Sequence, residues 1–214
     1  MTIKNIFNTE PQIYPDDRMK ILLYAQDKFF RGGFHKTSMD EIARELQISK
    51  GTLYKYFPSK LDIVSDAVKM LITGVKGQVE GLISAEGNAV EKFMQVIKLL
   101  TATITKFSDK WLSDLRHHAP HIWMKVDETR KVLLYENISK IIQQGQKEDL
   151  IKKYPPELII TMFIGAIRNV VNPDFLISTR LSYDEAVRHT FSILLGGTLT
   201  KKGLEILNKI EKRS

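Results

Sequence analysis

Apolar residues recur three or four positions apart along most of the 214-residue chain, and few segments alternate apolar with polar residues. This spacing places apolar side chains on one face of an α-helix, whereas a half-buried β-strand alternates at every second residue. The pattern therefore predicts an all-α fold of about nine helices. Breaker residues separate the helices, and we expect Gly196-Gly197 to close the last of them, residues 183–195.

The composition excludes several classes of protein. The chain has no cysteine, so disulfides, thiolate zinc sites and cysteine nucleophiles are excluded. The longest apolar run, residues 158–167, is far shorter than the roughly 20 residues that a membrane span needs, and residues 1–15 lack a signal-peptide core. We expect a cytoplasmic protein with no membrane partner. The net charge of +7 permits a nucleic-acid partner without demonstrating one.

Two short helices, over residues 38–46 and 49–57, are predicted to form a helix-turn-helix. Ser38 with Glu41 three positions later is a capping-box pattern, and Ser49 suits the cap of the second helix. In a helix-turn-helix the two helices pack at a steep angle, and the second one enters the major groove of DNA.

The second short helix is predicted to turn a polar face outward. Leu53 and Phe57 lie four positions apart and can anchor the helix to the core. The outward residues are then Lys50, Gly51, Thr52, Lys55 and Tyr56. Cations and hydroxyls suit phosphates, a threonine methyl can contact thymine, and glycine permits close approach. The alternative is a merely solvated face in a helical pair that never touches DNA.

Residues 18–63 resemble the DNA-binding domain of the tetracycline-repressor (TetR) family. The matching features are Phe29-Phe30 before Gly32-Gly33-Phe34, Thr37-Ser38-Met39 with Ile42-Ala43, and the block from Ser49 to Lys60. The turn departs from the family's usual Ala-Gly-Val, because this chain has Leu46-Gln47-Ile48. A left-handed backbone is common in such turns, and glutamine there costs about 1 kcal/mol relative to glycine. We expect the turn to persist.

The resemblance also implies which residues contact DNA. Contacts with phosphates and the DNA backbone would come from Thr37, Ser38, Lys50, Tyr54, Tyr56 and Lys60, and contacts with the bases from Gly51, Thr52 and Lys55. For Tyr54 the alternative is a place partly in the core.

The same resemblance implies the domain organisation and the function. We expect a flexible arm over residues 1–15, a helix-turn-helix DNA-binding domain over residues 16–62, and a helical effector-binding and dimerisation domain over residues 63–214. Such a protein would be a ligand-responsive transcriptional repressor. It would bind a near-palindromic operator in double-stranded DNA as a homodimer and be released by a small-molecule effector, with no cofactor. The alternative is a small-molecule carrier or a helical enzyme without a DNA function, although the chain has no glycine-rich phosphate loop, GxSxG or HExxH motif.

Candidates for the effector pocket are large or polar residues of the middle helices and the first apolar terminal helix. They are Met70, Phe93, Met94, Ile97, Phe107, Trp111, Arg116, His117, Trp123, Met162 and Asn169. The family builds its dimer from the two apolar terminal helices, where the candidates are Ile159, Phe163, Ile167, Val187, Phe191 and Leu195. For both sets the alternative is the core of a monomer. His117 and His121 have a metal-ligand spacing, but Pro120 separates them, so we predict no metal site.

Three glycines, Gly74, Gly77 and Gly81, lie on roughly one face of the helix predicted over residues 60–83. Each lowers the stability of a helix by up to about 1 kcal/mol relative to alanine. Two interpretations remain open. The glycines permit close packing against a neighbouring helix, or they form a soft segment between the effector pocket and the DNA-binding domain.

Overall fold

The computed structural model describes residues 17–104, 106–170, 175 and 178–212, which belong to two compact units. Unit 1 comprises Met1–Leu71 and Thr105–Lys125, and unit 2 comprises Ile72–Ile104 and Val126–Ser214. The predicted boundary after residue 62 falls inside a helix, and residues 105–125 join the N-terminal unit. The predicted arm over residues 1–15 lies outside the described residues.

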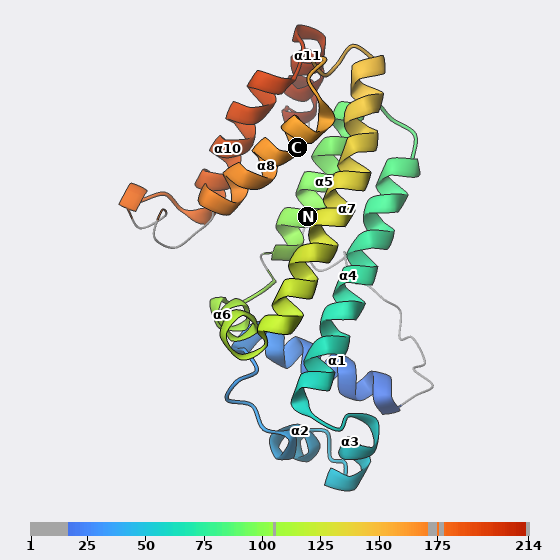
Figure 1. The fold of residues 1–214 in the computed structure, drawn as a ribbon, viewed down its shortest axis with the longest axis vertical. Coiled ribbons are helices and arrows are strands. Elements are labelled where there is room, and N and C mark those ends of the chain that lie inside the picture. Colours follow the sequence, from blue (N-terminus) through green and yellow to red (C-terminus); the bar gives the residue numbers. More distant parts are fainter. Residues whose placement is uncertain (1–16, 105, 171–174, 176–177, 213–214) are drawn as a thin grey trace. The chain divides into compact units, whose positions relative to one another are not determined.

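The described part of unit 1 consists of four whole helices and the beginnings of two longer ones (Figure 1). The whole helices are α1 (Asp17–Gly32), α2 (Met39–Glu45), α3 (Lys50–Tyr56) and α6 (Asp109–His118). The helices that continue into unit 2 are α4 (Lys60–Ser84) and α7 (Pro120–Lys147). α2 packs on α3 as the predicted helix-turn-helix requires, and α1 packs on α6.

Serine side chains begin three of the helices in unit 1. The Oγ atoms of Ser38, Ser49 and Ser108 each accept a hydrogen bond from the backbone N–H group three residues later. Each bond satisfies one of the free N–H groups at a helix N-terminus. In the turn between α2 and α3, Gln47 has a φ of 55°, so the left-handed conformation expected there is confirmed for a residue other than glycine.

Aromatic side chains from α1, α6 and the segment after α1 fill the core of unit 1. Trp111 of α6 is fully buried, and its ring centroid lies 4.8 Å from that of Phe30 and 5.6 Å from that of Phe34. Phe29, also fully buried, stacks on Trp111 at 6.5 Å. Offset and edge-on aromatic contacts add to the free energy of burial. This cluster attaches α6 to the N-terminal helices.

The described part of unit 2 contains the later parts of α4 and α7 and four further helices. These are α5 (Ala89–Ile104), α8 (Pro156–Val170), α10 (Tyr183–Thr198) and α11 (Lys201–Glu211). Pro120 and Pro156 are the first residues of α7 and α8, a position where no N–H donor is needed. The described residues form no strand, only an isolated antiparallel bridge between Ile151 and Leu199, so the all-α class is confirmed.

Two expectations about the C-terminal helices are wrong. α10 passes through Gly196-Gly197 and ends at Thr198, because both glycines are exposed and each costs a helix only about 1 kcal/mol. A further helix, α11, then begins where Thr200 Oγ1 accepts a hydrogen bond from the backbone N–H of Gly203. The described residues belong to eleven helices, α1 to α11, so the predicted number of about nine is too small.

Apolar side chains from α4, α5, α7, α8, α10 and α11 meet in the core of unit 2. The cluster includes Val79, Phe93, Ile141, Ile160 and Leu207. α8 lies beside α10 and α5 contacts α11 (Figure 1). Non-directional apolar burial therefore holds unit 2 together. Within the described ranges, every helix is too short or too polar to cross a bilayer.

Candidate nucleic-acid interface

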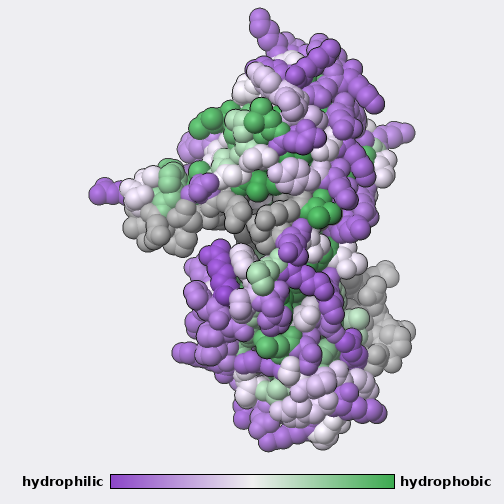
Figure 2. Space-filling model, viewed as in Figure 1, coloured by the Kyte–Doolittle hydropathy of each residue, from purple (hydrophilic) through white to green (hydrophobic). Residues whose placement is uncertain are grey.

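Two buried side chains anchor α3, and much of the rest of the helix is exposed. Leu53 and Phe57 are both fully buried, so these predicted anchors are confirmed. Gly51, Tyr54 and Lys55 are exposed, and Tyr54 has 46% of its surface accessible, which places it outside the core. The surface around α2 and α3 is mainly hydrophilic (Figure 2). The outer side of α3 is therefore open to a ligand along its length.

Three polar residues of α3 make local contacts. The hydroxyl oxygens of Ser49 and Thr52 lie 2.8 Å apart, and Thr52 is half-buried. Lys55 Nζ lies 5.9 Å from the ring centroid of Tyr56, within the range of a cation–π contact. These contacts restrain the side chains that would have to meet DNA.

Lys50, the first residue of α3, already has a partner of opposite charge. Its Nζ lies 2.6 Å from Oδ2 of Asp40 on α2, and this hydrogen bond raises the pKa of Lys50. The side chains of Lys50 and Asp40 are 65% and 56% exposed. The ion pair therefore lies at the surface, where another anion can compete for the ammonium.

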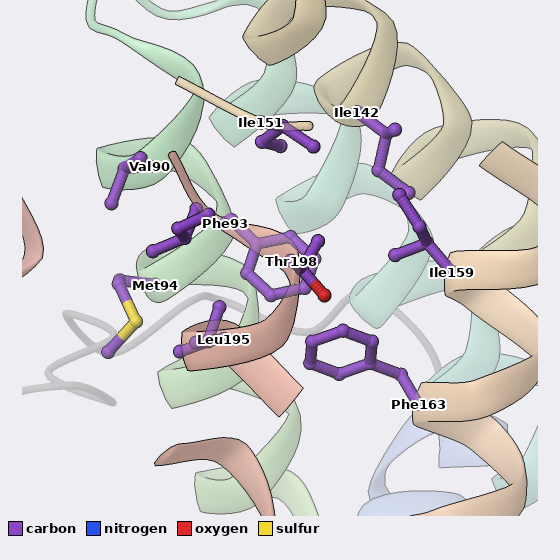
Figure 3. A pocket seen from close by; sticks show the side chains of 10 residues that line it. Val90, Phe93, Met94, Ile142, Ile151, Ile159, Phe163, Leu195 and Thr198 are labelled. Atoms are coloured by element: carbon purple, nitrogen blue, oxygen red, sulfur yellow. The ribbon is translucent and has the colours of Figure 1, made fainter. Parts of the chain in front are cut away.

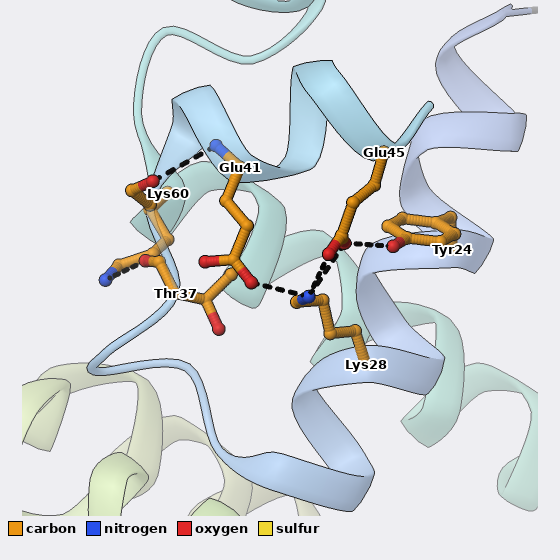
Figure 4. A network of polar contacts seen from close by, with 7 residues as sticks. Tyr24, Lys28, Thr37, Glu41, Glu45 and Lys60 are labelled. Atoms are coloured by element: carbon orange, nitrogen blue, oxygen red, sulfur yellow. Dashed lines mark hydrogen bonds and ion pairs between the residues drawn. The ribbon is translucent and has the colours of Figure 1, made fainter. Parts of the chain in front are cut away.

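Lys60 holds the segment that leads into α2 (Figure 4). Lys60 Nζ, at the start of α4, donates to the carbonyl oxygens of His35 and Thr37, both at 2.8 Å. Burial lowers the pKa of Lys60 below its ordinary value of 10.5. Thr37 is buried, whereas Ser38 is exposed and its Oγ caps α2. The ammonium of Lys60 is thus engaged within unit 1, where Thr37 is buried.

Sequence reasoning missed Asp114 of α6, which holds the same segment. Its Oδ2 accepts hydrogen bonds from the backbone N–H groups of Phe34 and His35 at 2.6 and 2.7 Å. Gly33 permits this approach, because a Cβ there would lie 2.5 Å from Asp114 Oδ2 and its φ of +78° favours glycine. No spacing rule links Asp114 to Phe34, which lies 80 positions away, so only the fold brings them together.

Lys28 of α1 fastens α2 through two carboxylates (Figure 4). Its Nζ lies 2.7 Å from an oxygen of Glu41 and 2.7 Å from an oxygen of Glu45, and Tyr24 donates its hydroxyl to Glu45. Hydrogen bonds from Lys28 lower the pKa values of both glutamates, and the same bonds raise the pKa of Lys28. This network orients α2, the helix on which α3 packs.

Unit 2 encloses a small apolar cavity between α5, α7, α8 and α10 (Figure 3). Its volume is about 10 Å³, which is room for about one water molecule. The lining residues are Val90, Phe93, Met94, Ile142, Ile151, Ile159, Phe163, Leu195, Thr198 and Leu199. The Thr198 hydroxyl, the one side-chain oxygen of this lining, donates to the carbonyl of Leu194. The cavity therefore favours apolar groups.

Only two of the predicted pocket residues, Phe93 and Met94, line the cavity, and Ile97 packs against the same core. The predicted residues that belong to unit 1 are Met70, Phe107, Trp111, Arg116, His117 and Trp123. In unit 2, Met162 is exposed and Asn169 donates to the carbonyl of Gly165. No group of three His, Asp or Glu among the described residues could hold a metal ion.

The predicted dimer residues lie mostly on the inner sides of α8 and α10. Ile159, Phe163, Val187 and Leu195 are buried in the chain, Phe191 is half-buried against the core, and the side chain of Ile167 lies outside the described ones. The exposed large apolar residues on the same helices are Leu158, Met162 and Ile193, and Ile193 is 74% exposed. Figure 2 shows hydrophobic surface over α8 and α10. The outer sides of these helices are the ones free to meet a partner.

Comparison with known proteins identifies the helix-turn-helix. The family described as "Bacterial regulatory proteins, tetR family" matches residues 21–67, which run from α1 through α2 and α3 into α4. Residues 21–67 therefore form a TetR-family DNA-binding region. The resemblance inferred for residues 18–63 is therefore confirmed.

Two bacterial relatives of the chain are helix-turn-helix regulators. The uncharacterized HTH-type transcriptional regulator YvaF of Bacillus subtilis (strain 168) is 25% identical over 166 residues, which cover 77% of this chain and 86% of YvaF. The HTH-type transcriptional regulator HbdR of Aromatoleum sp. (strain CIB) is 22% identical over 209 residues, which cover 95% of this chain and 90% of HbdR.

Solved structures share the TetR-like fold. A putative transcriptional regulator from Saccharomonospora viridis, in complex with choline, has a TM-score of 0.69 and 20% identity over 86% of this chain and 98% of that chain. A TetR/AcrR-family regulator from Thermobifida fusca has a TM-score of 0.65 and 22% identity, over 84% of this chain and 97% of that chain. The relatives and these neighbours are transcription regulators.

Proposed function

We propose that this TetR-family protein is a ligand-responsive transcriptional repressor that binds a near-palindromic operator as a homodimer in the cytoplasm. The observation that carries the proposal is the exposed side of α3, which Leu53 and Phe57 anchor. A rigid helix with exposed cations suits the major groove, where phosphates are near and base edges can be read.

The residues of this surface take different roles in the proposal. Lys50 and Tyr54 contact phosphates, while Lys55 reaches base edges and Gly51 lets the helix approach them. Lys60 acts by positioning, because its ammonium already binds two carbonyl groups of the segment before α2.

Homodimerisation is supported by the exposed apolar side chains of α8 and α10, which include Met162 and Ile193. A two-fold dimer presents α3 twice, as paired half-sites about one DNA turn apart require. Ile193→Asp is expected to give a monomer of unchanged helix content in analytical ultracentrifugation. Val132→Asp is the matched control, because Val132 is an exposed apolar residue of α7. If both variants stay dimeric, the proposed interface is wrong.

The effector is proposed to enter unit 2 at the apolar cavity. At about 10 Å³ the cavity is too small for an organic effector, so binding must displace Phe93, Met94 or Phe163. The lining favours an effector that places an apolar group there. An effector that binds the non-DNA form more tightly lowers the affinity for the operator.

The test of DNA binding is selection of bound genomic fragments followed by footprinting. The purified wild-type chain is expected to give a two-fold-symmetric footprint that weakens as salt is added. Lys50→Ala/Tyr56→Ala should lose the footprint, whereas the control Lys20→Ala/Tyr154→Ala, on exposed residues outside the helix-turn-helix, should keep it. Circular dichroism verifies that both variants fold. A folded wild-type chain that ignores every duplex in dilute salt would overturn the proposal.

A further inference from the structure

The two lysines of α3 have different partners. Lys55 lies over the ring of Tyr56, an uncharged group that leaves the ammonium free to act as a cation. Lys50 is paired with Asp40 at 2.6 Å, and among the described residues this is the only ion pair that involves α3. One of the two lysines of α3 is thus paired with a carboxylate of the same chain before any DNA binds.

Asp40 reaches Lys50 from the first turn of the neighbouring helix, α2. The next residue, Glu41, forms an ion pair with Lys28 of α1 instead, with 2.7 Å between Oε1 of Glu41 and Nζ of Lys28. α2 and α3 pack on each other, which keeps the two side chains within reach of one another while the helix-turn-helix is folded. Both side chains are more than half exposed, so a phosphate can reach the ammonium and compete with the carboxylate.

We propose that Asp40 limits the affinity of the protein for DNA by holding Lys50 until a phosphate displaces it. The inference rests on the proposed DNA-binding function. A phosphate contact gains free energy by releasing counterions from DNA. Lys50 contributes less of that gain than a free lysine, because it must first leave Asp40. The carboxylate is then left unpaired beside phosphates of like charge. Because Asp40 lowers the affinity for DNA, the effector has to overcome less binding free energy to release the protein from its operator.

The direct test is Asp40→Asn, which removes the charge and nearly preserves the shape. Exposed ion pairs contribute up to about 1 kcal/mol, so the variant should bind both operator and random-sequence duplex about two- to fivefold more tightly. The plot of log affinity against log salt concentration should steepen by about one unit per protomer, as expected for one more free cation at the interface. A purely structural role for Asp40 would leave this slope unchanged.

Two controls separate the pair from general electrostatics. Asp27→Asn makes the same change in net charge and frees an exposed cation, Arg31, on α1. It should leave DNA affinity near that of the wild type. In a Lys50→Gln background, Asp40→Asn should no longer tighten binding, because the lysine through which Asp40 acts is absent. The four proteins together form a double-mutant cycle that measures this coupling.

The outcomes separate this inference from the proposed function. If the wild type binds duplex DNA but Asp40→Asn binds no more tightly, or its gain survives in Lys50→Gln, the role of Asp40 is wrong and DNA binding stands. If Asp27→Asn gains as much, net charge alone explains the effect and the inference also fails. A wild type that binds no duplex overturns both. Asp40→Ser serves as a second variant, with the same expected gain, if Asp40→Asn does not fold.

Discussion

Unit 1 and unit 2 hold their proposed functional residues by different means. In unit 1, Lys28, Lys60 and Asp114 each join separate elements through directional polar contacts around the helix-turn-helix. In unit 2, the lining of the cavity is apolar apart from Thr198. Polar contacts fix the angles and distances between elements. A helix that must fit the regular groove of DNA, the proposed partner, requires such fixed geometry. Apolar packing fixes volume and patterning and permits rearrangement, which suits a site that must open for an effector.

The largest expected effect concerns Trp111, which belongs to the core of unit 1. Trp111→Ala should lower the free energy of unfolding by about 3–5 kcal/mol, because it removes the ring that three phenylalanines contact. Urea denaturation followed by circular dichroism measures the change. Trp123→Ala is the control and should cost less, since Trp123 is only half-buried. Equal losses in the two variants would contradict the assignment of Trp111 to this core.

Gly33 offers the next largest effect and tests the directional contacts of unit 1. Gly33→Ala forces a Cβ to within 2.5 Å of Asp114 Oδ2 and leaves a non-glycine residue at a φ of +78°. We expect a loss of about 1–3 kcal/mol in unfolding free energy. The neighbouring Gly32→Ala meets nothing within 4 Å and should be neutral or slightly stabilising. A tolerated Gly33→Ala would show that Asp114 does not hold the segment before α2.

The Lys28 network predicts how the stability of unit 1 depends on pH. Glu41 and Glu45 have pKa values below the ordinary 4.5 in the folded state, so the folded chain binds fewer protons than the unfolded chain in acid. Their contribution is fully present above pH 4.5 and is lost as the pH falls through the folded values. The raised pKa of Lys28 adds stability that is complete below 10.5 and is lost as the pH rises through the raised value.

Lys28→Gln tests this dependence by removing the partner of both carboxylates. The wild type should exceed the variant in melting temperature near neutral pH, and the difference should shrink as the pH falls below 4.5. Lys20→Gln is the control, because its pair with Asp17 is long, at 3.8 Å, and exposed. A difference between wild type and Lys28→Gln that does not change with pH would disprove the proposed charge contribution.

The sequence was sufficient for α2 and α3 because short-range patterns determine them. Serine caps, the four-residue spacing of Leu53 and Phe57, and the left-handed turn at Gln47 are all local features. Local patterns contain nothing about Asp114, whose partners lie about 80 residues earlier. They also did not indicate that Lys60 binds carbonyl groups of its own unit.

Unit 2 was less predictable because its helices carry apolar residues on more than one side. On α8, Ile159 and Phe163 are buried while Leu158 and Met162 are exposed, although all four are apolar. A helix that is apolar nearly all round has no polar stripe to mark its outer side. The inner and outer sides follow from packing against α10, which involves long-range contacts.

The smallest expected effect concerns the glycines of α4, the helix that belongs partly to unit 1 and partly to unit 2. They test whether the backbone of this helix is flexible where it passes from one unit into the other. A Cβ at Gly74, Gly77 or Gly81 would meet nothing within 4 Å, so close packing within the described chain does not explain them. Gly77→Ala should stabilise the helix by up to about 1 kcal/mol, because it removes backbone freedom from the unfolded chain. Hydrogen exchange of the backbone amides around residue 77 should slow accordingly. Exchange as fast as in the wild type would mean that these glycines do not soften α4, the helix that runs from unit 1 into unit 2.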